Sequence, residues 1–193
     1  MSAPVRGRRA NGPWLTGLVA LAAVALHCWP RAGAALFYER ARILDGEWWR
    51  LWTGHFVHFG ASHLGWNLAV LLPAGAWAER LAPARTRVFL ALAPLVIGIA
   101  LLVLDPALAR YAGLSGVVSG VLALLAFTQL AADGAARWFW HGVLALLALK
   151  IGVELFAGHA VFAHFDVPDV HAVPLAHAAG MVCAGAAHWI RRK

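Results

Sequence analysis

Hydrophobic positions along this chain form long runs, and most polar positions fall in the short segments between them. Each run is close to the roughly 17–25 apolar residues that a helix needs to cross the hydrocarbon core of a bilayer. Six membrane spans are predicted, near residues 14–29, 62–78, 88–104, 115–131, 138–157 and 172–190.

The predicted fold is an all-α polytopic membrane protein, with one domain over residues 1–193. Composition agrees, since 62% of the residues are hydrophobic and 13% are charged. That leaves too little polar surface for an ordinary soluble domain. No linker, second domain, low-complexity tract or repeat is recognised.

The first predicted span and its flanking residues have two interpretations, a membrane span or a signal peptide. Residues 1–13 are basic and contain no acidic residue, which suits a cytoplasmic N-terminus. A basic start, an apolar core and the small residues at 31–35 are also typical of a cleaved signal peptide. Whether residues 1–33 contain a first span or a cleaved signal is left open.

Residues 31–61 mix charged and aromatic side chains, which favours a structured first loop at the membrane interface. The formal net charge is +7, but most Lys and Arg residues flank the apolar runs, where they set topology rather than bind nucleic acid. Their distribution predicts that both termini are cytoplasmic. Cys28 and Cys183 lie in apolar segments and indicate neither a disulfide framework nor a thiolate metal site.

The unusual polar residues cluster at one membrane face. With six spans, the second, fourth and sixth run in the same direction, so their N-terminal ends meet there. Ser115 opens the fourth span, and His177 lies about one turn into the sixth. A serine hydroxyl needs a base to become a nucleophile, and a neutral imidazole is the usual one. Small residues, including Gly116 and Gly180, would let these two helices approach closely.

The second span supplies candidate donors. His63 and Asn67 are four residues apart, so they share one helix face and can direct N–H groups at one point. Such donors stabilise the negative charge that forms on an attacked carbonyl. The Ser115 backbone N–H, at a helix N-terminus, could act as a third donor. Asn67 could instead serve only as an interhelical hydrogen-bonding residue.

Other histidines allow weaker alternatives. His55, His58 and His63 could be metal ligands, but no HExxH motif or nearby carboxylate accompanies them. His159, His164 and His171 share the last loop with Asp166 and Asp169, for which a solvated loop is the simpler interpretation. Lys150 and Glu154 are four residues apart within the fifth span and are expected to form a structural ion pair rather than a proton relay.

Four motifs in this order resemble the rhomboid family of intramembrane serine proteases. They are Trp49-Arg50, His58 with His63-xxx-Asn67, Gly113-Leu114-Ser115-Gly116, and Ala176-His177-xx-Gly180. The similarity covers about residues 43–190. The compact length is most similar to the rhombosortase subgroup, which is thought to process proteins with C-terminal Gly-Gly sorting tails in Gram-negative bacteria.

The resemblance implies a six-helix rhomboid-like bundle in which Ser115 is the nucleophile and His177 the general base. His63, Asn67 and the Ser115 amide would form the oxyanion hole. No third acid, cofactor or metal ion is implied. Many bacterial rhomboids have a tyrosine four residues after the serine, stacked on the catalytic histidine, whereas this chain has Ser119. Either an aromatic side chain from elsewhere replaces it, or Ser119 hydrogen-bonds the imidazole. Supporting positions carried over with the motifs are Arg50, His58, Gly113, Gly116, Ser119 and Gly180.

The resulting expectation is a serine endopeptidase of the bacterial inner membrane, with its active site open to the periplasm. Its partners would be membrane-anchored protein substrates, which would reach the site laterally near the fifth span, and the lipid bilayer. The first alternative is an inactive rhomboid-like protein that binds transmembrane clients. The second is a small transporter or metal-binding membrane protein. Oligomeric state, client identity and any acyl transfer to an amine are left open.

Overall fold

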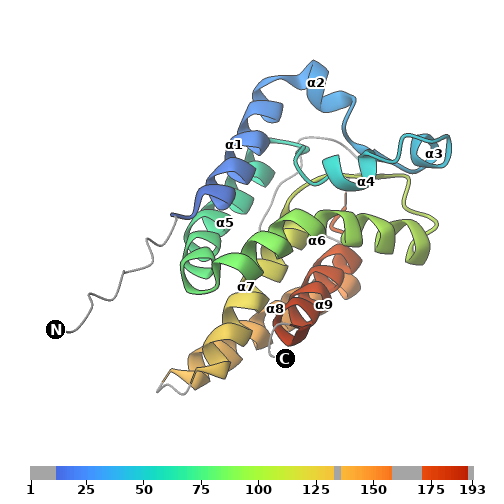
Figure 1. Cartoon of the computed structure of the whole chain (residues 1–193). Coiled ribbons are helices and arrows are strands. Elements are labelled where there is room, and N and C mark those ends of the chain that lie inside the picture. Colours follow the sequence, from blue (N-terminus) through green and yellow to red (C-terminus); the bar gives the residue numbers. More distant parts are fainter. Residues whose placement is uncertain (1–11, 133–135, 158–170, 191–193) are drawn as a thin grey trace.

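The computed structural model describes residues 12–132, 136–157 and 171–190, and its long helices lie where the hydrophobic runs predict spans (Figure 1). They are α1 (Trp14–Cys28), α5 (Ala61–Leu81), α6 (Pro83–Leu104), α7 (Ser115–Ala131), α8 (Arg137–Ala157) and α9 (Pro174–Ile190). Between α1 and α5 lie the short helices α2 (Pro30–Ala34), α3 (Arg40–Leu44) and α4 (Arg50–Thr53). Strands β1 (Tyr38–Glu39) and β2 (Arg110–Tyr111) pair antiparallel. The helical architecture is confirmed, and this short strand pair is an element that the all-α prediction missed.

Predicted and observed boundaries differ most at α6. This helix begins at Pro83 rather than near residue 88, so that Ala82 alone separates it from α5. Proline suits the first turn of a helix, because its ring presets φ and its missing N–H would have no intrahelical partner there. The charged residues Arg85 and Arg87 lie near the start of this helix, and for that reason the hydrophobic pattern does not include this part in the predicted span. The predicted start of this span is therefore too late, since the helix already begins at Pro83.

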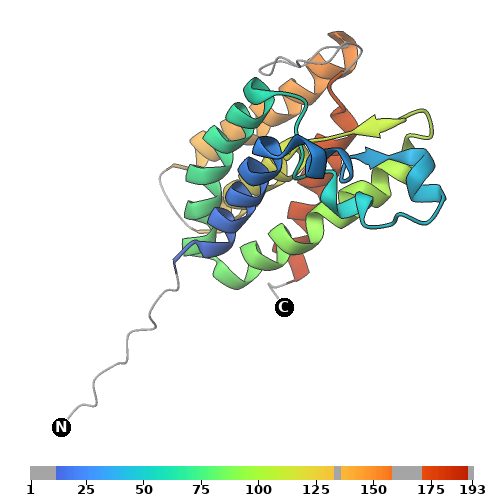
Figure 2. The same ribbon diagram turned by 90° about the horizontal axis from the view of Figure 1, so that it is seen from above.

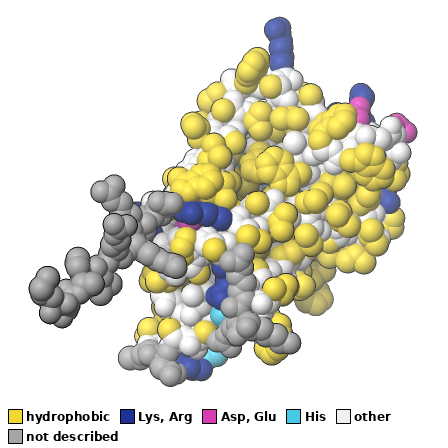
Figure 3. Space-filling model, in the orientation of Figure 1, with side chains coloured by type: hydrophobic (Ala, Val, Ile, Leu, Met, Phe, Trp, Pro, Cys, Tyr) yellow, Lys and Arg dark blue, Asp and Glu magenta, His cyan; other side chains and the backbone are white. Residues whose placement is uncertain are grey.

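Two of the described helices, Pro83–Leu104 and Arg137–Phe156, are long and apolar enough to cross a membrane. Trp14–Cys28 and Ser115–Ala131 are apolar but shorter. At a rise of 1.5 Å per residue these two extend about 22 and 26 Å, somewhat less than the hydrocarbon thickness of about 30 Å. The count of six spans thus stays a prediction. Hydrophobic side chains cover much of the face shown in Figure 3, as expected of a surface in contact with lipid.

Helix α7 lies inside the bundle and packs against α5, α6, α8 and α9, as the two views of Figures 1 and 2 illustrate. Its contact with α9 is the most extensive between any two described elements. A Cβ at Gly116 would lie only 2.7 Å from the Ala176 carbonyl oxygen, and a Cβ at Gly180 would overlap the Gly116 carbonyl oxygen. The close small-residue contact predicted between the fourth and sixth spans is therefore confirmed.

Helix α1 is joined to α5 by a buried polar contact. The carboxylate of Glu79, which has no exposed surface, accepts hydrogen bonds from the Thr16 N–H at 3.0 Å and from the Thr16 hydroxyl at 2.9 Å. It also accepts one from the Leu15 N–H at 3.3 Å and pairs with Arg87 Nε at 2.8 Å. A carboxylate at a helix N-terminus satisfies free N–H groups and complements the helix dipole. These contacts favour residues 14–28 as a first helix of the folded domain.

The segment between α1 and α5 is folded, which confirms the structured loop. Arg50 is buried and binds Glu47 Oε2 through Nε at 2.6 Å and the Phe37 carbonyl through Nη1 at 2.8 Å. The hydrogen bond from Arg50 lowers the pKa of the Glu47 carboxyl. Pairing of β1 with β2 joins this segment to the connection that leads into α7. Arg50 therefore stabilises the fold of this loop, and it is not among the residues that line the cavity described below.

Candidate active site

Ser115 is the first residue of α7, and a set of backbone contacts holds the turn before it. Gly113 has a φ of +115°, in the left-handed region that favours glycine. Its N–H donates to the Gly54 carbonyl at 3.1 Å, and its carbonyl accepts from the Tyr111 hydroxyl at 2.9 Å. A Cβ at Gly113 would overlap the His63 ring. Glycine is needed here for its backbone conformation and for the close approach of the imidazole.

His58 completes the support of this turn. The Leu114 N–H donates to His58 Nε2 at 3.4 Å. Burial, followed by repulsion from His63, lowers the pKa of His58 to about 3. A neutral ring that accepts at Nε2 carries its proton on Nδ1. His58 thus contacts the backbone before Ser115, and it is not among the residues that line the cavity described next.

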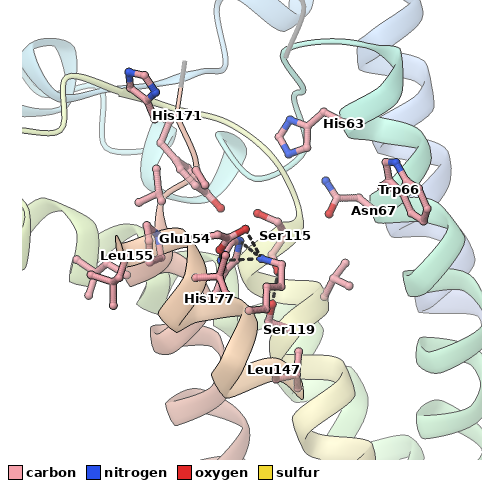
Figure 4. A pocket seen from close by; sticks show the side chains of 18 of the residues that line it. His63, Trp66, Asn67, Ser115, Ser119, Leu147, Glu154, Leu155, His171 and His177 are labelled. Atoms are coloured by element: carbon pink, nitrogen blue, oxygen red, sulfur yellow. Dashed lines mark hydrogen bonds and ion pairs between the residues drawn. The ribbon is translucent and has the colours of Figure 1, made fainter. Parts of the chain in front are cut away.

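A cavity of about 1050 Å³ brings the predicted site residues together. Ser115 from α7, His177 from α9, and His63 and Asn67 from α5 all line it. Figure 4 shows His63 and Asn67 on one side of Ser115, with His177 on the other. The hydrogen bonds of the described residues include none between the Ser115 hydroxyl and the His177 ring. Proton transfer between the two would need His177 Nε2 to come within about 3 Å of the Ser115 hydroxyl.

The side-chain amide of Asn67 has a hydrogen-bond donor within this cavity that no described residue satisfies. Its side chain is buried, and Nδ2 has no hydrogen-bond partner within the described ranges. A buried amide donor without a partner costs roughly 1–3 kcal/mol, so such groups call for an explanation. A donor that lines a cavity beside a serine can be satisfied by a bound carbonyl oxygen.

Comparison with known proteins shows what kind of protein holds this cavity. Residues 45–193 match the Rhomboid domain, a range that includes every long helix except α1. The chain belongs to the rhomboid family. It is 36% identical over 93 residues to Rhomboid protease GluP of Bacillus subtilis (strain 168), a match that covers 48% of this chain and 18% of that relative. The chain thus spans less than a fifth of that relative's length. As a rhomboid, it is a multi-pass membrane protein.

In this rhomboid, Ser119 does not support the imidazole. Its hydroxyl donates to the Ser115 carbonyl, one turn earlier on α7, at 2.9 Å. The expected alternative of a Ser119 hydrogen bond to His177 is therefore wrong. The ring contacts among the described residues include none to His177, so an aromatic replacement is not found there either.

Two charged residues on α8 contact His177 instead. Lys150 and Glu154 form the predicted ion pair, with Nζ and Oε1 2.7 Å apart. The other carboxylate oxygen, Oε2, lies 2.7 Å from His177 Nδ1, and Lys150 Nζ lies 3.0 Å from the same nitrogen. Sequence reasoning paired Lys150 with Glu154 and missed the histidine. The available signal was general, because ionisable residues inside membrane helices most often serve a function.

The remaining candidates lie in different surroundings. His55 is fully buried beside the Tyr111 ring, at a centroid distance of 5.2 Å, and burial lowers its pKa to about 4. His171 lines the cavity, whereas His159, His164, Asp166 and Asp169 lie outside the described residues. Across the described ranges, no group of three His, Cys, Asp or Glu residues is arranged to hold a metal ion.

Proposed function

We propose that this rhomboid is an intramembrane serine endopeptidase. The observation that carries the proposal is the meeting of four side chains from three helices, Ser115, His177, His63 and Asn67, at one cavity. Each supplies what the others lack: a hydroxyl, a base and two donors. Membership of the rhomboid family and the similarity to a rhomboid protease support the same chemistry.

Ser115 acts as the nucleophile, and His177 takes its proton and later protonates the leaving amine. The charge that forms on the carbonyl oxygen is received by His63, by Asn67 and by the Ser115 N–H. That N–H lies in the first turn of α7, where it has no intrahelical acceptor and where the helix dipole favours an anion. The buried Asn67 amide, which has no partner among the described residues, gains one when the oxyanion forms.

Substrates are membrane-anchored proteins whose transmembrane segments reach the cavity laterally near α8. The apolar side chains of Trp66 and Val70 on α5 and of Leu146 and Val153 on α8 line the cavity and suit such a segment. A helix must unwind before its peptide bond can be attacked, because helical hydrogen bonds are otherwise retained in lipid. Glycine near the cleavage point makes unwinding easier.

The compact chain and the order of its motifs favour the rhombosortase subgroup, which would remove C-terminal Gly-Gly-type tails. In this proposal both termini are cytoplasmic, the membrane is the bacterial inner membrane, and the cavity opens to the periplasm. The Lys and Arg distribution supports that orientation.

A fluorophosphonate probe on the detergent-purified protein tests the protease proposal. We expect covalent labelling at Ser115, and we expect it to disappear in Ser115→Ala and in His177→Ala. Client binding without any labelling of folded protein would favour the inactive, client-binding alternative. Tolerance of Ser115→Ala, combined with loss of function on changing His55, His58 or His171, would favour a transporter or metal-binding protein.

The substrate class needs a separate experiment. Surface and secreted proteins are compared between cells that carry the wild-type gene and cells that carry Ser115→Ala. We expect proteins with Gly-Gly-type tails to retain those tails in the mutant. If they mature normally while Ser115 is still labelled by the probe, the subgroup assignment is wrong and the protease proposal stands.

A further inference from the structure

Glu154 of α8 makes a contact that neither the ion pair nor helix packing requires. Its side chain is 2% exposed, and its Oε2 faces Nδ1 of His177, a side chain that is 4% exposed, at 2.7 Å. Its other oxygen receives Lys150. Figure 4 shows Glu154 and His177 together beside Ser115, at the wall of the cavity. A carboxylate, an imidazole and a serine thus follow one another across α8, α9 and α7.

The proton position on His177 decides whether this arrangement is productive. A neutral imidazole carries one proton, on Nδ1 or on Nε2, and only the nitrogen without it can act as a base. With the proton on Nδ1, the N–H lies beside Glu154 Oε2 and the basic lone pair is on Nε2, which lies 3.5 Å from Lys150 Nζ. With the proton on Nε2, the Nδ1 lone pair would face the carboxylate oxygen at 2.7 Å and repel it.

Lys150 favours the opposite tautomer, with the proton on Nε2. Its ammonium group lies 3.0 Å from Nδ1 and could donate a hydrogen bond to that nitrogen. Glu154 has the stronger effect for two reasons. It is nearer to Nδ1, at 2.7 Å against 3.0 Å for Lys150 Nζ. The contact does not have hydrogen-bond geometry, since Oε2 has no hydrogen-bond partner among the described residues, so a small turn of the ring is needed before Nδ1–H can donate to it. Glu154 also holds Lys150 Nζ at 2.7 Å, so that the ammonium has a carboxylate as its first partner.

We propose that Glu154 is the acidic member of a Ser115–His177–Glu154 triad and a positioning residue for the reaction. It holds His177 with its proton on Nδ1 and stabilises the imidazolium that forms during the attack. Lys150 in turn fixes the carboxylate across one turn of α8. The proposal rests on the protease function above and changes it from a dyad to a triad. It also explains how the ring is supported although residue 119 is a serine.

The proton path follows from this geometry. As the bond from the Ser115 hydroxyl oxygen to the carbonyl carbon forms, the hydroxyl proton passes to His177 Nε2 and an electron pair moves onto the carbonyl oxygen. The C–N bond then breaks, and the Nε2 proton passes to the leaving amine. Water hydrolyses the acyl-enzyme with the same base. Glu154 stays ionised throughout and receives no proton, as in other triads.

Glu154→Gln keeps the side-chain volume and removes the charge, so it is the principal test. With a model transmembrane substrate, we expect kcat to fall on the order of 10²–10⁴-fold, with KM within about threefold of the wild-type value. A purely structural role would lower the folded fraction and leave kcat per folded molecule unchanged. A kcat within about threefold of wild type in folded Glu154→Gln would overturn the proposal.

Lys150 requires a second variant, because Glu154→Gln leaves a buried ammonium without its partner, which is strongly destabilising. Lys150→Met combined with Glu154→Gln removes both charges and carries the test if the single variant does not fold. We expect the double variant to remain as impaired in kcat as Glu154→Gln. Recovery of wild-type kcat would show that the unpaired lysine, rather than the missing carboxylate, caused the loss.

Glu79→Gln is the matched control. It neutralises another fully buried carboxylate, 16 residues beyond His63 on α5 and hence about 24 Å away along the helix. We expect it to lower stability while kcat stays within twofold of wild type. Ser115→Ala separates the two proposals: if it keeps wild-type activity, the protease function itself fails. If Ser115→Ala is inactive and Glu154→Gln is fully active, only the triad fails.

The position of the proton can also be observed directly. The ¹⁵N chemical shifts of labelled imidazoles distinguish the two tautomers, and a difference spectrum against His177→Ala assigns the signals. We expect the proton on Nδ1 in the wild-type protein and a shift toward Nε2 in Glu154→Gln. A wild-type His177 with its proton on Nε2 would contradict the triad whatever the kinetics show.

Discussion

Gly180 lies where α9 crosses α7, and adding one methyl group there tests whether helix packing sets the position of His177. A Cβ at residue 180 would overlap the Gly116 carbonyl oxygen and lie 2.9 Å from the Gly116 carbonyl carbon. Carbon atoms in contact are normally about 3.5–4.0 Å apart, so the contact with the carbonyl carbon alone requires the two helices to separate by roughly 0.6–1.1 Å, and the overlap with the oxygen requires more.

His177 is three residues before Gly180 and moves with α9. A displacement of about 1 Å at a reacting group can lower the rate about a hundredfold. We therefore expect Gly180→Ala to lower kcat roughly 10- to 100-fold. Overpacking of this kind also destabilises by about 1–3 kcal/mol, so the rate must be referred to folded protein, measured by thermal unfolding in the same detergent.

Gly185→Ala on the same helix is the control. The nearest atom to a Cβ at residue 185 is Phe127 Cε2, at the ordinary contact distance of 3.9 Å. We expect this variant to keep wild-type labelling and cleavage. The reasoning is refuted if folded Gly180→Ala labels at the wild-type rate, or if Gly185→Ala is equally impaired.

Three further predictions concern neighbouring contacts. Tyr111→Phe removes the hydroxyl that binds the Gly113 carbonyl, and we expect it to lower the unfolding free energy by about 1–2 kcal/mol and to slow probe labelling. Glu79→Gln weakens the contact that holds α1, and we expect a loss of about 1–3 kcal/mol in thermal unfolding without a change in labelling per folded molecule. His55 and His58 have pKa values lowered to about 4 and about 3, so the unfolded chain binds more protons below pH 6.5. The unfolding free energy should therefore be highest above pH 6.5, where both histidines are neutral in either state. It should fall toward pH 4, by up to about 1.4 kcal/mol per pH unit for each histidine.

Each of these has an outcome that would count against it. Tyr38→Phe is the control for Tyr111, because the Tyr38 hydroxyl is also buried, near Arg40, and is not the hydroxyl that bonds the turn at Gly113. Equal destabilisation by the two changes would mean that the bond to Gly113 is unimportant. Unchanged stability in Glu79→Gln would remove the reason to regard α1 as part of the core. A stability that is flat from pH 7 to pH 4 would contradict burial of His55 and His58 in neutral form.

Helix positions could be predicted well because hydrophobicity depends on the residues alone. The run at 115–131 matches α7 residue for residue. The start of α6 could not be predicted in this way, because Arg85 and Arg87 interrupt the apolar pattern without interrupting the helix. The pairing of β1 with β2 was also missed, since two-residue strands leave no periodic signal and depend on segments about 70 residues apart.

Ser115, His177, His63 and Asn67 could be selected from the chain because helix direction alone places the starts of alternate spans at one face. Their residue types then indicate a nucleophile, a base and donors. The hydrogen bond of Ser119 to its own helix, and the contact of Glu154 with His177, depend on side-chain rotamers and on how α8 packs beside α9. Spacing along one helix shows that Lys150 and Glu154 can meet each other, but it carries no information about a third residue on another helix. For that reason the sequence alone identifies the serine and the histidine, whereas the carboxylate beside the histidine is found only from the packing of α8 against α9.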